Sequence, residues 1–93
     1  MSAVAPGDTV LCMCVIADST NSRFRFYWYM PPGESIGGKD TTYGGVKAYV
    51  TSWNQIRWKA PSKPDFYSFE VSVDDNDENL APVHEIFQVI VKQ

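Results

Sequence analysis

The sequence predicts an all-β fold, an antiparallel β-sandwich of about seven short strands. Between Tyr67 and Asp74, apolar and polar residues alternate strictly, and residues 55–60 do the same. A period of two is typical of a strand with one buried and one solvated face. Turn residues separate such segments at intervals of roughly eight to fifteen residues, and no segment has a convincing helical period.

The first half of the chain contributes three of these strands. Residues 3–5 form a short edge strand that ends at Pro6-Gly7, and residues 8–17 form the next. The second strand is apolar on both faces, which predicts a central strand or one covered on its outer side by a loop. After a polar turn at 18–22, residues 23–30 alternate, with Phe24, Phe26 and Trp28 on one face.

The second half begins with a segment of different composition. Residues 31–45 hold five glycines and two prolines, which predicts a long mobile loop or a weak edge strand. Residues 46–51, 54–60 and 66–74 follow as strands, and an acidic turn leads to the last strand, residues 83–92. We expect the inner face of this last strand to carry Phe87, Val89 and Val91.

Length and charge exclude several classes of protein. We expect one domain over residues 1–93, excised from a larger multidomain protein. A net charge of -3 argues against general nucleic-acid binding, which usually needs a strongly basic surface. No run of eighteen apolar residues is present, so we expect no membrane insertion.

The two cysteines, Cys12 and Cys14, point to the same face of a strand. Residues two apart on a strand are about 6.5–7 Å apart, at or beyond the usual reach of a disulfide. We interpret both as reduced core residues. The alternative, half of a soft metal site, lacks the other ligands that zinc needs, since the only histidine is His84.

Five motifs in order resemble the bacterial immunoglobulin-like domains of the PKD-like type. Together they cover most of the chain except residues 31–45, although the Trp-Asp-Phe-Gly-Asp-Gly run of true PKD repeats is absent. The motifs are Pro6-Gly7-Asp8-Thr9-Val10, Asp18, Phe24-Arg25-Phe26-Tyr27-Trp28, Ile56-Arg57-Trp58-Lys59-Ala60-Pro61 and Tyr67 through Asp75.

The resemblance implies a particular core. Cys14 stands where an immunoglobulin domain has its first bridging cysteine, and Phe69 stands where the second would fall. A packed core of Cys14, Trp28, Trp58 and Phe69 would then replace the disulfide, and Tyr67 would form a tyrosine corner with the preceding turn. Domains of this type usually occur in extracellular or cell-surface proteins, as spacers or binding modules beside other domains.

Two kinds of site are less favoured. Catalysis is not expected, because no nucleophile, base and orienting group stand together and His84 lies at the start of a predicted strand. Calcium is an alternative for the acidic turn, where Asp74, Asp75 and Asp77 offer hard oxygen donors. The competing interpretation of this turn is a solvated hairpin, and we expect no obligatory cofactor.

Outward-facing aromatic and basic residues suggest a binding surface. Tyr27 and Tyr29 project from one strand with Arg23 and Arg25, and Trp53 lies between two later strands. The leading hypothesis is a non-catalytic structural or adhesion module with a protein partner. The alternative is a carbohydrate-binding accessory module, in which these aromatic rings stack on sugars. A cover over the tyrosines by residues 31–45, or cross-strand pairing, would instead make them structural.

Overall fold

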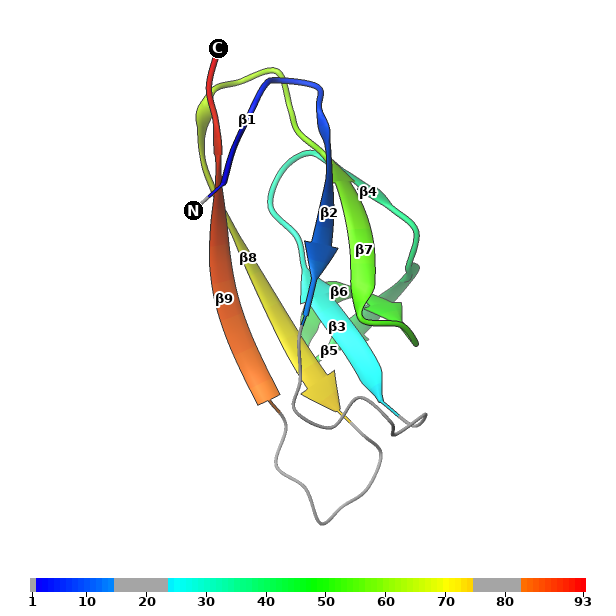
Figure 1. Cartoon of the computed structure of the whole chain (residues 1–93). Helices are drawn as coiled ribbons and strands as arrows, with labels where there is room; N and C mark the ends of the chain where they lie inside the picture. The colour runs from blue at the N-terminus through cyan, green and yellow to red at the C-terminus, as the bar shows by residue number, and fades with distance from the viewer. Residues whose placement is uncertain (1, 15–23, 75–82) are drawn as a thin grey trace.

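The computed structural model describes residues 2–14, 24–74 and 83–93, and these residues form an all-β structure of nine strands in two sheets (Figure 1). Among them there is no helix with the length and apolarity that a membrane span requires. The strands are β1 (Ser2–Val4), β2 (Thr9–Met13), β3 (Arg25–Tyr29), β4 (Glu34–Ile36), β5 (Lys39–Tyr43), β6 (Val46–Thr51), β7 (Gln55–Lys59), β8 (Asp65–Asp74) and β9 (Val83–Val91).

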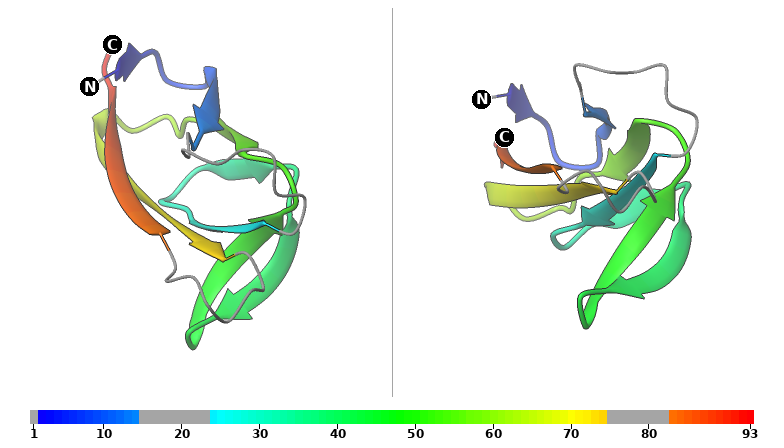
Figure 2. Two further views of the ribbon diagram at one scale, coloured as in Figure 1. Left: turned by 60° about the horizontal axis from the view of Figure 1, so that its bottom comes forward. Right: turned by 90° about the horizontal axis from the view of Figure 1, so that it is seen from below.

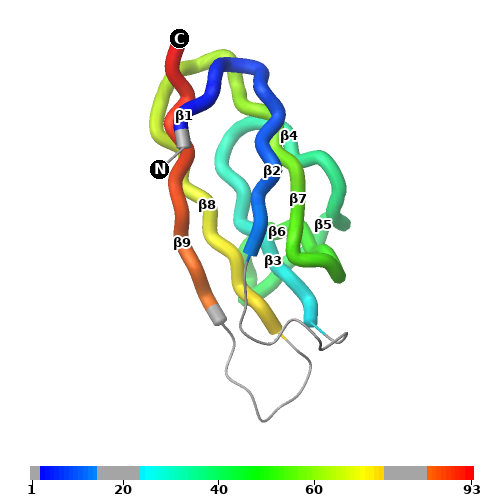
Figure 3. The backbone as a smooth tube through the Cα atoms, viewed as in Figure 1, coloured from blue at the N-terminus to red at the C-terminus, as the bar shows by residue number. Residues whose placement is uncertain are grey.

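The two sheets differ in size. The large sheet has six strands in the order β1-β9-β8-β3-β6-β5, and the small sheet has three in the order β2-β7-β4. All neighbours are antiparallel except β1 and β9, which run parallel at the two ends of the chain (Figure 3). Figure 2 shows the small sheet lying over part of the large one, an arrangement compatible with the predicted sandwich.

The core lies between the sheets and is built around two tryptophans. Trp28 of β3 and Trp58 of β7 are both 0% exposed, and Phe69 packs edge-on against Trp58 at 4.9 Å between ring centroids. Cys14 and Tyr67 belong to the same buried cluster. The period-two pattern produces this core, because each strand turns its apolar residues inward.

Hydrogen bonds satisfy the polar atoms of these core aromatics. Trp28 Nε1 donates to Thr51 Oγ1 at 2.9 Å, and Trp58 Nε1 donates to the Pro32 carbonyl at 3.2 Å. The Tyr67 hydroxyl donates to the Lys63 carbonyl at 2.7 Å, which is the contact expected of a tyrosine corner. Each ring therefore supplies buried apolar area without leaving a donor unpaired.

Residues 31–45 form edge strands, which is one of the two alternatives that the sequence predicts. They contain two strands, β4 at the edge of the small sheet and β5 at the edge of the large sheet. Gly33, with φ of 126°, lies where an added Cβ would collide with the Trp58 ring. Glycine is therefore required for this segment to approach the core, and its glycines are part of ordered turns and close contacts.

The prediction of a central or covered second strand is wrong for the described part of that segment. β2 is an edge strand of the small sheet. Cys12 of β2 and Cys14, which directly follows the strand, are buried free thiols, whereas Leu11 and Met13 on the outer face are 47% and 48% exposed. Its apolar outer face therefore needs another explanation.

Candidate functional site

The outer face of the small sheet carries a contiguous set of exposed apolar side chains, which we call the apolar face. Leu11 pairs across the sheet with Arg57, and Ile36 pairs with Arg57 from the other side. Met13 lies opposite Gln55, next to this row. With Trp53, these residues define the surface, whose members are Leu11, Met13, Ile36, Trp53, Gln55 and Arg57.

Trp53 is the most exposed member, at 68%, although it lies in the chain between two ordered strands. The Thr51 hydroxyl donates to its carbonyl, and the neighbouring Asn54 side chain donates to the Cys14 carbonyl at 3.0 Å. These contacts tie the β6–β7 connection to both sheets. The backbone of Trp53 is thus held in place while its indole ring faces solvent.

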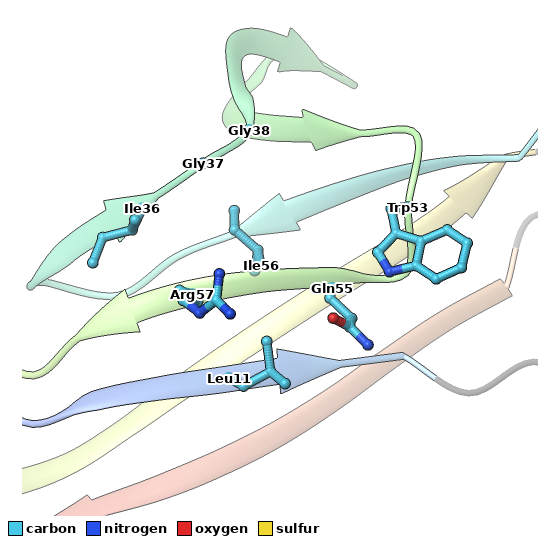
Figure 4. A pocket seen from close by; sticks show the side chains of 8 residues that line it. All are labelled: Leu11, Ile36, Gly37, Gly38, Trp53, Gln55, Ile56 and Arg57. Carbon is cyan, nitrogen blue, oxygen red and sulfur yellow. The ribbon is translucent and has the colours of Figure 1, made fainter.

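A shallow depression of about 190 Å³ lies within this surface (Figure 4). Trp53, Gln55 and Arg57 follow one another along the outer side of the chain that leads into β7, and Leu11 and Ile36 flank Arg57. Arg57 has no ion pair among the described residues. An unpaired guanidinium between apolar side chains is suited to a partner that brings a carboxylate to an apolar contact.

The predicted tyrosines lie on the opposite side of the molecule, on the outer face of the large sheet. Tyr27 stacks on Tyr43 of β5 at 4.0 Å between ring centroids. The Tyr29 hydroxyl donates to the Tyr43 carbonyl at 3.3 Å. The structure therefore favours the alternative in which these rings pair with residues 31–45, and it separates them from Trp53.

Asp74, predicted as a calcium ligand, is engaged with this tyrosine cluster. The Tyr43 hydroxyl donates to Asp74 Oδ2 at 3.1 Å, and burial, followed by this hydrogen bond, raises the pKa of Tyr43. Asp75 and Asp77 lie outside the described residues, as does Arg23. Within the described part of the chain, no group of three or more His, Cys, Asp and Glu side chains could hold a metal ion.

Arg25, the other predicted basic residue, uses its guanidinium locally. It donates to the Phe24 carbonyl at 3.0 Å, on the same side of the molecule as the tyrosines. Of the four predicted binding residues that the structure describes, only Trp53 therefore belongs to the apolar face.

The two cysteine thiols are the side chains that could act as nucleophiles. Burial raises the pKa of Cys12 to about 11, and burial together with Glu85 raises the pKa of Cys14 to about 11. Both thiols therefore stay protonated at neutral pH, where a nucleophilic cysteine must be a thiolate. His84 lies elsewhere, on β9, with Nε2 3.2 Å from Glu70 Oε2.

Sequence reasoning missed Leu11, Met13 and Ile36 as surface residues. The available signal was the double apolar character of residues 8–17, which is rare for a strand whose outer face is solvated. Comparison with known proteins adds no further assignment, because no family model, no curated protein and no solved structure matches this chain.

Proposed function

We propose that this chain is a single immunoglobulin-like, non-catalytic module of a secreted or cell-surface protein, acting as a spacer or protein-binding domain beside neighbouring domains. The two-sheet all-β architecture and the disulfide-free core are consistent with this proposal. The location and the domain family rest on the sequence resemblance. The binding role rests on the apolar face.

The apolar face is the observation that carries the proposal. Four large apolar side chains, 40–68% exposed, gather on one side of a three-stranded sheet. Contiguous apolar patches of this kind mark protein interaction sites more often than isolated exposed residues do. Tryptophan and arginine, both present here, are the residues most enriched where binding energy concentrates.

Site-specific photo-crosslinking in the native host tests this proposal. A photoreactive residue in place of Gln55 should capture a protein partner, whereas one in place of Gln88 on the large sheet should not. Binding of the purified partner should then weaken at least about tenfold in Trp53→Ala, because a hot-spot ring is lost. Phe66→Ala, which removes an exposed ring from the other sheet, is the matched control. Equal capture at both positions, or equal weakening by both variants, would contradict the proposal.

A carbohydrate partner is the second candidate, favoured by the row of Trp53, Gln55 and Arg57. An exposed indole can stack on a sugar ring, an amide can bond hydroxyls, and a guanidinium can pair with the carboxylate of an acidic sugar. Affinity electrophoresis in gels of neutral and uronic-acid polysaccharides tests this candidate. Retardation that is lost in Trp53→Ala supports it, whereas unchanged mobility in every polysaccharide contradicts it.

A further inference from the structure

The two sheets have four edges in the described structure, and three of them carry features that discourage pairing with another strand. β5 begins with the charged residues Lys39 and Asp40. β4 has only three residues and lies between Pro31-Pro32-Gly33 and Gly37-Gly38. Charged residues, short length, proline and nearby glycine all limit edge-to-edge association.

The third protected edge combines β1 with the part of β9 that extends beyond it. β1 has three residues and pairs only with Val89 to Val91. On the uncovered part of β9, Glu85 is paired with the buried Val71 and lies 3.9 Å from the Cys14 thiol, so its carboxylate is directed toward the inner side. An inward-pointing charge on an edge strand is a recognised obstacle to further pairing.

None of these features occurs within β2 itself, although Pro6-Gly7-Asp8 lies just before it. Its five residues, Thr9–Met13, include no charge, no proline and no glycine. Cys14 N donates to Asn54 O at 2.9 Å and Ala60 N donates to Asp8 O at 2.8 Å, so the even-numbered residues bond to β7. Because bonding direction alternates along an antiparallel strand, the backbone groups of Thr9, Leu11 and Met13 point away from β7. No described strand pairs with that side of β2.

We propose that this free edge pairs with the β2 strand of a second copy of the chain, antiparallel and centred on Leu11. In that register Leu11 lies opposite Leu11 of the second copy. Thr9 lies opposite Met13 of the second copy, and Val10 lies opposite its Cys12. The odd-numbered residues supply about six inter-chain backbone hydrogen bonds, two for each facing pair. Every facing pair joins neutral side chains, so the strand is complementary to itself, as a two-fold interface requires.

The charges around β2 favour this occupant. β2 has no charged residue that could pair with a charged peptide. A second β2 strand is itself uncharged and needs no such pairing. The nearest like charges are the two Arg57 side chains, each one strand away from Leu11. Three strand spacings separate them, about 14 Å, which exceeds the screening length of about 8 Å at physiological ionic strength.

Pairing would join the two small sheets into one and place the two apolar faces side by side. The interface uses the backbone edge of β2, whereas the proposed partner binding uses the outward side chains around Trp53. The two proposals therefore fail independently. We expect a weak, concentration-dependent dimer, because the paired segment is short and interfaces of small area are usually transient.

Sedimentation velocity of the whole chain, from about 10 µM to about 1 mM, tests the dimer. Leu11→Lys and Leu11→Glu should each raise the dimer dissociation constant at least about tenfold, because like charges then face each other across the two-fold axis. An equimolar mixture of these two variants should recover association, because opposite charges then face each other. Ile36→Lys, on the same face but away from β2, should leave the constant unchanged, and Trp53→Ala should do the same.

Three results would overturn the proposal. The first is a wild-type chain that stays monomeric at every concentration. The second is an equal effect of Ile36→Lys and Leu11→Lys, which would place the contact on the sheet face and not on its edge. The third is a mixture of the two Leu11 variants that associates no better than either alone. The recovery measured in the mixture also excludes misfolding of either variant as the cause of lost association.

Discussion

The outer faces of the two sheets differ in how their side chains contact one another. On the large sheet, outward side chains bind one another: Tyr27 stacks on Tyr43, Glu70 pairs with His84, and Gln88 donates to Ser68. On the small sheet, the described outward residues form no ion pair, and large apolar groups remain exposed. The large sheet also exposes Val46, Phe66 and Ile86, but none of these lies opposite another, because they pair with Tyr43, Ile90 and Glu70. On the small sheet, Leu11 and Ile36 flank the same residue, Arg57.

Contacts within the described chain therefore explain which residues lie on the outer face of the large sheet. They do not explain the exposed apolar residues on the outer face of the small sheet. A solvated antiparallel sheet normally alternates apolar inward and polar outward residues, as β8 does. β2 departs from that rule at Leu11 and Met13, which are 47% and 48% exposed. Substitutions should therefore cost folding free energy on the large sheet and inside the core, but little on the apolar face.

The largest expected difference in the free energy of unfolding is between variants of two tryptophans, Trp58 in β7 and Trp53 just before it. Trp58→Ala removes a fully buried ring and should lower the free energy of unfolding by about 3–5 kcal/mol. Trp53→Ala removes an exposed ring and should change it by no more than about 0.5 kcal/mol. Urea titration of both variants, followed by circular dichroism, measures the difference. A similar loss in both would show that Trp53 supports the fold.

A second pair of variants tests how firmly β4 is held against the core. Gly33→Ala places a methyl group against the Trp58 ring and should cost about 2–4 kcal/mol through overpacking and backbone strain. Gly37→Ala, with φ of 90° and open space around its Cβ, should cost only about 1 kcal/mol from the backbone alone. The two midpoints of thermal unfolding give this comparison. Equal midpoints would mean that the Gly33 segment moves freely away from Trp58.

The sequence predicted the inner side of the molecule far better than its outer side. Trp28, Trp58 and Phe69 follow from a strict period of two, which leaves each strand only one way to bury its apolar residues. The pairing partner of each strand is set by long-range contacts, so the edge position of β2 could not be inferred from its apolar composition. Residues 31–45 were difficult for a related reason, since their glycines permit both loops and closely packed strands.

The tyrosine cluster was predicted only as an alternative, a cover over the tyrosines by residues 31–45, and its individual contacts could not be inferred. Tyr27 and Tyr43 are separated by sixteen positions in the chain and by one strand in the sheet. Their stacking depends on the β5–β6 hairpin, which brings Tyr43 back across the sheet. The sequence pattern gave the outward direction of Tyr27 but not its partner.

A third comparison uses the same polar replacement on the two outer faces. Tyr27→Ser removes the ring that stacks on Tyr43 and should cost about 2 kcal/mol, from lost apolar burial and aromatic packing. Leu11→Ser removes a half-exposed side chain and should cost about 0.5 kcal/mol or less. Guanidinium titrations of the two variants measure both values. A larger loss for Leu11→Ser would show that the apolar face is part of the core.

The last comparison varies the pH and concerns the two sides of β2. Burial raises the pKa of Cys12 and of Cys14 from 9.0 to about 11, so the folded state favours the neutral thiols. Their contribution is fully present below about pH 9 and is lost as pH rises toward 11, because the unfolded chain releases these protons first. The midpoint temperature of unfolding of the wild type should therefore decrease as the pH is raised from 9 to 11.

The double variant Cys12→Ala/Cys14→Ala is the control for this pH effect, because other groups also titrate in alkaline solution. Its midpoint should start lower, since two buried side chains are shortened, but should fall less steeply above pH 9. Leu11→Ser, on the exposed side of the same strand, should keep the wild-type slope. If the double variant also kept the wild-type slope, the thiols would not be the groups that make the inner side of β2 sensitive to alkaline pH.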